Sequence, residues 1–292
     1  MDLTQLYCSV DDFWKSFKQE WDKHLIDSGK TKRGPEPKLS TSEMMTIVIL
    51  FHGSNYRTFK HFYAYVCKYL RKDFPNLISY SHFVYLMKNL FIPLFAYLLQ
   101  RRGEITGIAF IDSTSIDVCH NKRIQRNKVF KGLAKRGKTT AGWFYGFKLH
   151  LIINEEGELL AFQLTPGNMA DVSIAKTLSK GIFGKLFGDK AYISAELTKK
   201  LLEQDLELFT ALRSNMKRRL MKLTDKVLLR KRAVIETVND QLKNISQIEH
   251  TRHRSAANFL INLLAGMSAY THQPKKPSIN LVPEDRLLLM AA

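Results

Sequence analysis

The sequence has 292 residues, 45% of them apolar, which is enough for one domain of ordinary size and a smaller one. Its 45 lysine and arginine residues outnumber 27 aspartate and glutamate residues, so the formal net charge is +18. This excess is larger than solubility requires and favours a polyanionic partner, nucleic acid before a membrane surface. A basic protein without such a partner stays the alternative.

The cysteines and the N-terminal residues indicate the cellular compartment of the protein. The three cysteines are scattered without CxxC spacing, so they indicate neither a disulfide framework nor a zinc site and are compatible with a reducing cytoplasm. The N-terminus, MDLTQLYCSVDDF, lacks the basic flank and apolar block of a signal peptide, and no apolar run approaches the roughly 20 residues that a bilayer requires. We therefore expect a soluble cytoplasmic protein with no membrane partner.

Helical periodicity dominates residues 10–100, where aromatic and aliphatic residues recur every three or four positions. In the stretch PKLSTSEMMTIVILFHG, Ser40 or Thr41 is placed to cap a helix that ends at Gly53. A second helix follows after SNYR, an arrangement that resembles a helix-turn-helix. Helical hairpins are common, so two roles stay open for this region: contact with DNA and structural support.

Beyond residue 103 the periodicity changes, and the pattern predicts an α/β domain. The expected elements, in order, are strands at 107–113, 143–154 and 158–165, a helix at 169–181, a strand at 182–190, a helix at 194–205, a strand at 207–213, and helices at 224–245 and 255–270. This succession is the one expected of an RNase H-like fold, a mixed sheet with helices on both faces, although other α/β folds share it. We expect a helical N-terminal domain at 1–100, the α/β domain at 101–272 and a flexible tail at 273–292.

Two aspartates stand at the ends of predicted strands. Asp112 lies just past the apolar run GIAFI, and Asp189 follows the run IFGKLFG. If the two strands are neighbours, both carboxylates meet at one end of the sheet, where open α/β sheets carry their sites. Two anions about 4 Å apart repel by roughly 4 kcal/mol at an effective dielectric of about 20, so the pair needs a cation, and Mg²⁺ prefers such hard oxygen ligands. The alternative is that each aspartate only caps the helix or turn that follows it.

A third carboxylate, Glu236, interrupts an apolar helical pattern in LLRKRAVIETVNDQLKN. Arg232 stands four residues before it and Lys243 seven residues after it, so all three lie along one stripe of a helix. The stripe has two interpretations. One is an ion pair on the surface, which contributes little to stability. The other is that Glu236 is a third metal ligand and that its basic neighbours hold phosphates. Asp240, one turn further on, would be the third ligand if the helix register differs.

These residues together carry a family resemblance. The set Asp112, Asp189 and Glu236 resembles the DDE triad of bacterial insertion-sequence transposases, which belong to the RNase H-like and retroviral-integrase superfamily. The resemblance extends from about residue 107 to residue 270 and includes IDSTSI, WFYGFKLHLIIN, the turn TPGNMAD and GDKAYIS. Only 46 residues separate Asp189 from Glu236, too few for the large inserted domain of some relatives.

The third motif is similar to the Tyr-x2-Arg-x3-Glu-x6-Lys signature of that superfamily. Its spacing matches at Arg232, Glu236 and Lys243. Leu229 stands where the signature has tyrosine, which removes whatever phosphate contact that tyrosine makes in relatives.

The resemblance implies a DNA transposase that binds the ends of an insertion sequence, cuts phosphodiester bonds and joins the ends to target DNA. Two Mg²⁺ ions, or Mn²⁺ in their place, would be held by Asp112, Asp189 and Glu236 and would promote in-line displacement, with the carboxylates acting as ligands and not as proton-transfer acids. The implied partners are transposon-end and target DNA and further copies of the chain, because pairing two ends takes at least a dimer. The cytoplasmic enzyme would act on the nucleoid.

Basic residues flank the predicted site along the chain and are expected to contact phosphates, although charge runs are usually solvated surface. One cluster lies between the first two motifs, in a Gly-containing stretch expected to be a mobile loop: Lys122, Arg123, Arg126, Lys128, Lys131, Lys135, Arg136 and Lys138. A second cluster precedes Glu236: Arg213, Lys217, Arg218, Arg219, Lys222, Lys226, Arg230 and Lys231. Lys190, directly after Asp189, joins the expected DNA contacts.

The aromatic run Trp143, Phe144 and Tyr145 has two interpretations. Packing into the core of a strand is the more common role of such residues, whereas Trp143 could also stack on an unpaired base beside the cut.

Several other polar residues have ordinary structural roles as their first interpretation. Asp117 and Asp171 are expected in turns or helix caps, with auxiliary metal binding as the alternative. His120 has no partner at metal-ligand spacing, and His150 is expected on a strand face.

Two other functions are compatible with the same residues. A metal-dependent nuclease of the same fold would hydrolyse DNA without joining it. A non-enzymatic or catalytically degenerate DNA-binding regulator would use the helical region and the +18 charge, with the acidic residues serving as caps.

Overall fold

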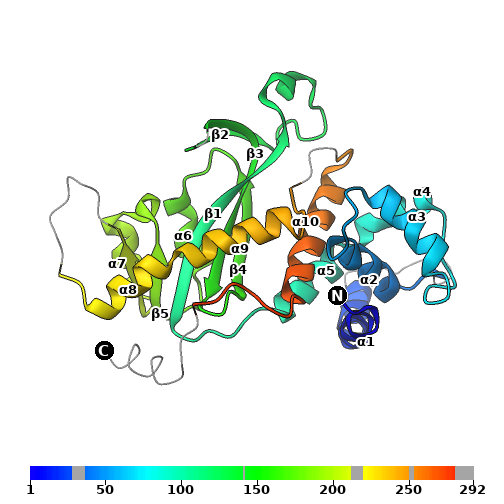
Figure 1. The fold of residues 1–292 in the computed structure, drawn as a ribbon, viewed down its shortest axis with the longest axis horizontal. Coiled ribbons are helices and arrows are strands. Elements are labelled where there is room, and N and C mark those ends of the chain that lie inside the picture. The colour runs from blue at the N-terminus through cyan, green and yellow to red at the C-terminus, as the bar shows by residue number, and fades with distance from the viewer. Residues whose placement is uncertain (28–36, 141, 212–219, 250–252, 280–292) are drawn as a thin grey trace. The chain divides into compact units, whose positions relative to one another are not determined.

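The computed structural model describes residues 1–27, 37–140, 142–211, 220–249 and 253–279 (Figure 1). The chain forms two compact units. The first contains Met1–Arg101, Leu242–Ile248 and His253–Gln273, and the second contains Arg102–Gln241 together with Glu249 and residues 274–279. The division into an N-terminal domain, a catalytic domain and a tail stays a prediction, and most of the expected tail, residues 280–292, lies outside the described residues.

The first unit is helical. Its elements are α1 (Leu3–Asp27), α2 (Thr41–His52), α3 (Phe59–Tyr69), α4 (Tyr80–Leu86), the 3-10 helix η1 (Met87–Leu90), α5 (Phe91–Gln100) and α10 (Ala256–Thr271). Ser40 caps α2: its hydroxyl accepts from the N–H of Glu43, whose carboxylate accepts in return from the N–H of Ser40. The predicted end of this helix at Gly53 is confirmed.

The segment Tyr80–Gln100 has 21 residues and, by length and composition alone, could cross a membrane. No run of this length and apolarity was expected from the sequence. In the first unit, Phe83, Leu90, Leu94 and Leu98 of this segment are buried. Since core helices of soluble proteins have the same composition, the segment is weak evidence for a membrane location.

Among the residues that the structure describes, the second unit is built on a six-stranded mixed sheet. Its strands are β1 (Ile108–Cys119), β2 (Lys135–Thr139), β3 (Gly142–Asn154), β4 (Leu159–Pro166), β5 (Gly184–Gly188) and β6 (Leu206–Thr210). The order is β2-β3-β1-β5-β6, and β4 also pairs with β3. β3 pairs antiparallel with β1, β2 and β4, whereas β5 pairs parallel with β1 and with β6. The predicted RNase H-like mixed sheet is confirmed.

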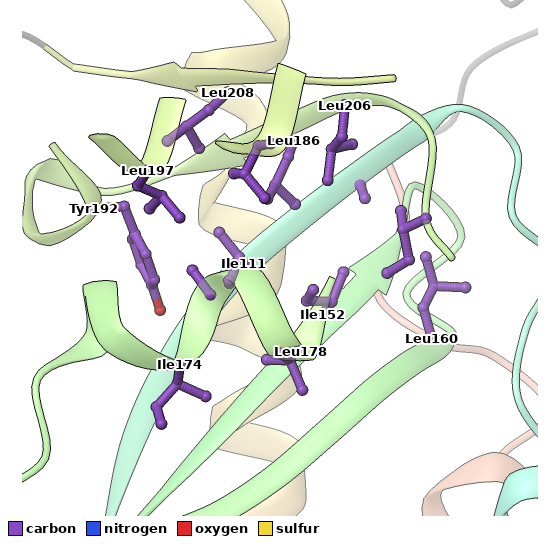
Figure 2. Close-up of a cluster of buried hydrophobic side chains, with 14 residues drawn as sticks. Ile111, Ile152, Leu160, Ile174, Leu178, Leu186, Tyr192, Leu197, Leu206 and Leu208 are labelled. Carbon is purple, nitrogen blue, oxygen red and sulfur yellow. The ribbon is translucent and has the colours of Figure 1, made fainter. Parts of the chain in front are cut away.

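Helices cover both faces of this sheet (Figure 1). One face carries α6 (Asp171–Leu178), the 3-10 helix η3 (Lys190–Tyr192) and α7 (Ala195–Leu202). Their apolar side chains form a buried cluster with alternate strand residues, among them Ile111, Ile152 and Leu186 (Figure 2). The opposite face carries α8 (Leu223–Lys231) and the N-terminal part of α9 (Ala233–Asn244).

On the α9 face, aromatic rings pack across the three parallel strands. The ring of Phe187 in β5 lies 5.6 Å from that of Phe110 in β1 and 5.1 Å from that of Phe209 in β6, measured between centroids. Each of these residues alternates with a member of the opposite cluster, so the strands are buried on both faces.

Three predictions of local structure were wrong. The first strand does not end at residue 113 but continues to Cys119, because residues 113–119 pair with the long strand β3. The helix expected at 224–245 is two helices, interrupted at Arg232. The basic stretch expected as a loop contains the 3-10 helix η2 (Asn121–Arg126) and strand β2.

Gly146 permits the close approach of β3 to β1, since a Cβ there would lie 2.0 Å from the carbonyl oxygen of Ile116.

Replacing Phe187 by alanine should lower the free energy of unfolding by about 3–5 kcal/mol, because it removes a fully buried ring that contacts two others. The matched control is Phe183→Ala, whose ring is 47% exposed and which should cost about 1 kcal/mol or less. Urea denaturation of both variants measures the difference. Equal losses would contradict the placement of Phe187 in the core.

Candidate active site

The pairing of β1 with β5 determines where the two aspartates lie. The parallel register joins Ile108 to Lys185, Ala109 to Leu186 and Phe110 to Phe187. Asp112 lies two residues further along β1, and Asp189 lies two residues beyond Phe187, directly after the end of β5. The condition that the two strands are neighbours is therefore met, and the charge of Asp189 acts on the carboxyl of Asp112.

Asp112 lies inside its strand, whereas the sequence pattern predicted it at the strand's end. It is the fifth residue of β1 and pairs with Leu151 of β3, at the level where β5 ends and β1 continues. Because side chains alternate along a strand, Asp112 lies on the α9 face, opposite the face of Ile111. Asp112 thus lies on β1 at the level where its β5 neighbour has ended, under helix α9.

Asp189 makes the capping interaction that was one of its two possible roles. One carboxylate oxygen accepts a hydrogen bond from the N–H of Ala191 at 2.7 Å, at the start of η3. This bond fixes the side chain at the end of β5. The cap accounts for one lone pair, so it does not exclude a ligand on the rest of the carboxylate.

Glu236 lies on α9 and makes the ion pair that the sequence allowed. Its Oε1 accepts from Nη2 of Arg232 at 2.6 Å, with the Glu236 side chain 56% exposed and that of Arg232 20% exposed. Both charges act on the carboxyl of Asp112 in β1: Arg232 lowers its pKa, and Glu236 raises it. Asp240 is on an exposed position of the same helix, and Lys243 is in its last turn.

Burial dominates the electrostatics of Asp112 and raises the pKa of its carboxyl to about 6. The backbone of Ser113 and the charge of Arg232 act in the opposite direction, while Asp189 and Glu236 raise the pKa further. The hydrogen bond and the charge of Arg232 thus offset only part of the effect of burial and of the two neighbouring acids.

The three carboxylates have the chemistry that a hard divalent cation requires of its ligands. Asp112, Asp189 and Glu236 offer carboxylate oxygens from three different elements, and the raised pKa of Asp112 shows where added positive charge would be favourable. Within the described ranges, no three acidic, histidine or cysteine side chains are close enough together to hold one ion. Glu236 is engaged with Arg232, so its carboxylate would have to turn toward the aspartates to complete a cage.

Asn239 contacts Asp112 and is not among the residues that the sequence pattern predicted for the site. Its Nδ2 donates a hydrogen bond to Oδ2 of Asp112 at 3.2 Å. The residue is 7% exposed and lies among the apolar positions of α9. The available signal was a polar residue three positions after Glu236, on the face of the helix that the apolar pattern predicts to be buried.

A polar network occupies the opposite face of the sheet at the same level. Asp171, at the start of α6, accepts from the hydroxyl of Ser113 at 2.7 Å and from Nζ of Lys148 at 3.1 and 3.2 Å. His150 is buried on β3, as expected, and contacts the hydroxyl of Thr165 at 2.8 Å. Burial lowers the pKa of His150 to about 4, so the imidazole is neutral near pH 7. The network ties β1, β3, β4 and α6 together next to Asp112.

Two aspartates are not in the turns or caps predicted for them. Asp171 is in the first turn of α6 but makes no capping bond, and it pairs with Lys148 instead. Asp117 is inside β1 next to a bulge, and its N–H donates to Oε1 of Glu249 at 2.9 Å. For Asp117 the cause is the extension of β1 beyond its predicted end, and for Asp171 it is the contact with Lys148 and Ser113 of the sheet.

The first basic cluster forms an exposed surface on η2 and β2. Lys128, Lys131, Lys135 and Arg136 are exposed, as is Lys190 beside Asp189. A hollow of about 740 Å³ lies in this surface and is lined by Asn121, Lys122, Ile124, Gln125, Gly132, Ala134, Lys135, Arg136 and Tyr145. In the second cluster, Lys222, Lys226, Arg230 and Lys231 are exposed, whereas Arg213, Lys217, Arg218 and Arg219 lie outside the described residues.

The aromatic run on β3 divides between its two possible roles. Phe144 and Tyr145 are buried, as core packing predicts. Trp143 is 60% exposed, with Nζ of Lys138 located 5.8 Å from its ring centroid. Its indole therefore remains accessible to a stacking partner.

Comparison with known proteins assigns the family. A family model described as "Transposase DDE domain" matches residues 102–256, more than half of the chain and all of the segment from Asp112 to Glu236. The chain belongs to the DDE transposase family. Its members are DNA-cleaving and DNA-joining enzymes that generally use divalent metal ions.

One solved structure similar to this DDE transposase chain is a piggyBac transposase synaptic complex with hairpin DNA. The two are 12% identical, the match covers 86% of this chain and 70% of that chain, and the TM-score is 0.44. No curated protein matches the sequence.

Removing the charge of Asp112 should stabilise the metal-free fold. Its pKa rises from an ordinary 3.8 to about 6 on folding, so ionisation opposes folding, and the stability of the parent chain falls as the pH rises through this window. In chelator at pH 8, Asp112→Asn should therefore unfold with a free energy higher by about 1–3 kcal/mol, and the difference should vanish near pH 4.

Urea denaturation at the two pH values measures this effect. The control is Asp240→Asn, an exposed carboxylate on α9, which should change the free energy of unfolding by about 0.5 kcal/mol or less. A less stable Asp112→Asn at pH 8 would mean that the carboxylate is needed by the fold.

Proposed function

We propose that this chain binds the ends of an insertion sequence, cleaves phosphodiester bonds there and joins the ends to target DNA. The proposal is supported above all by the β1–β5 register, which brings Asp112 beside Asp189 in a chain of the DDE family. Glu236 enters from the helix that covers the same face, and its charge reaches Asp112.

In this proposal Asp112, Asp189 and Glu236 bind two Mg²⁺ ions, for which Mn²⁺ can substitute. Bound there, the ions would supply Lewis-acid activation of the attacking water or 3′-hydroxyl and stabilisation of the leaving oxygen. Asp189 keeps its bond to Ala191, which holds its carboxylate in place. Glu236 leaves its ion pair with Arg232 and turns toward the two aspartates, and Arg232 then becomes able to bind a phosphate.

Basic side chains would bind the DNA backbone. Arg232 and Lys243, on either side of Glu236 in the sequence, and Lys190, directly after Asp189, would hold the phosphates beside the cut. Lys128, Lys131, Lys135 and Arg136 would bind the flanking duplex, and Trp143 would stack on an unpaired base. Recognition of end sequences would fall to the helical region 1–100, in an assembly of at least two copies on two DNA ends that acts on the nucleoid.

Each charge-removing change in the triad should abolish metal-dependent nicking of a duplex that carries the terminal inverted repeats flanking the coding segment. The variants are Asp112→Asn, Asp189→Asn and Glu236→Gln, and the expected loss is at least 100-fold because metal positioning depends on every ligand. DNA binding, measured by mobility shift, should persist. The matched control is Glu203→Gln at the exposed end of α7, which should retain parental activity.

Full nicking by any triad variant would remove that residue from the proposed site. A strand-transfer assay on the same DNA separates joining from hydrolysis. Nicked product without joined product would identify a nuclease, and DNA binding without either product would identify a regulator.

Changing the metal preference tests the contact with Asp112 directly. A thiolate is a poor ligand for Mg²⁺ and a better one for the softer Mn²⁺. Asp112→Cys should therefore be inactive in Mg²⁺ and recover part of its nicking rate in Mn²⁺. Equal activity in both metals would show that this side chain does not touch an ion.

Neutralising Lys128, Lys131, Lys135 and Arg136 together should weaken DNA binding and flatten its dependence on salt, by about 0.9 in the logarithmic slope for each phosphate that the variant no longer neutralises. Filter binding at several salt concentrations measures the slope. The matched control removes four cations from α6, α7 and the turn after α6: Lys176, Lys180, Lys199 and Lys200. The same slope change in both variants would show that the effect comes from the net charge of the protein and not from phosphate contacts of this cluster.

A further inference from the structure

Asn239 occupies an unusual position for an amide. It lies on α9 three residues after Glu236 and is buried like its fully buried neighbours on the same helix, Ile235 and Val238. Its side chain is directed at the carboxylate of Asp112, to which Nδ2 donates at 3.2 Å. This hydrogen bond links the helix that carries Glu236 to the strand that carries Asp112.

The other end of the Asn239 amide lacks a partner. Its Oδ1 is buried, and within the described part of the chain no donor reaches it. A buried acceptor without a hydrogen bond is unfavourable, whereas leucine has a similar volume and no such requirement. Stability of the fold alone therefore does not account for asparagine at this position, while the bond to Asp112 does.

We propose that Asn239 is a positioning residue for metal binding by Asp112. A carboxylate turns readily about its last side-chain bond. The Nδ2 donor holds Oδ2 of Asp112 and so limits this rotation before an ion arrives, leaving the second oxygen to bind. Outer partners of this kind orient metal ligands in many sites, and their loss typically weakens metal binding 10–100-fold. The inference rests on the proposed function, because it assumes that Asp112 is a ligand.

The test measures Mn²⁺ binding to the full chain by electron paramagnetic resonance, without DNA. Asn239→Leu should weaken Mn²⁺ binding at least tenfold, and Asn239→Gln, which keeps an amide donor on a longer arm, should restore most of the loss. The matched control is Gln241→Leu, which removes another partly buried amide from α9 and should leave the affinity unchanged. Thermal unfolding in chelator should show Asn239→Leu to be at least as stable as the parent chain.

A second readout needs no metal. The Asn239 side-chain amide resonances, assigned by their absence in Asn239→Leu, should shift in Asp112→Asn.

Parental Mn²⁺ affinity in Asn239→Leu would overturn the inference alone. So would loss of stability in Asn239→Leu that Asn239→Gln does not restore, since that pattern indicates a packing role. No Mn²⁺ binding by the parent chain, with the amide resonances still responding to Asp112→Asn, would overturn the proposed function and the inference with it.

Discussion

The parallel pairing of β1 with β5 is the constraint on which the candidate site depends. It joins two segments separated by more than 70 residues in the chain and fixes their register through Phe110 and Phe187, so that Asp112 and Asp189 come side by side two residues later. The rings of Phe110, Phe187 and Phe209 on one face and the aliphatic cluster on the other make a slip in this register costly. The hydrophobic core thus sets the geometry of the carboxylates.

The carboxylates make the site unfavourable for the metal-free chain. Burial and two neighbouring acids oppose ionisation of Asp112, and Arg232 compensates only in part. On the other face, Asp171 accepts a hydrogen bond from Ser113 of β1 and is itself paired with Lys148 of β3. Backbone held by hydrogen bonds on one face and uncompensated negative charge on the other are the features that a divalent cation would use.

Sequence patterns predicted most of the fold, because the hairpin of β3 and β4, the strands β5 and β6, and the helices α6, α7 and α10 all follow local periodicity and turn residues. They did not predict β2 or the full length of β1, whose polar residues Ser113, Ser115 and Asp117 become strand only through pairing with β3. The convergence of Asp112 with Asp189 was predicted conditionally, since pairing of distant strands is not encoded locally. Asn239 and the partners of Asp171 were missed because their roles come from tertiary contacts.

The central claim is that the three carboxylates bind divalent ions on DNA. Crystals of the chain with end DNA and Mn²⁺, recorded at the manganese absorption edge, test it most directly. We predict anomalous density between the carboxylates of Asp112 and Asp189, with Glu236 turned from Arg232 toward it. Manganese bound elsewhere, with Asp112 contacting only Asn239 and Glu236 still paired with Arg232, would contradict it.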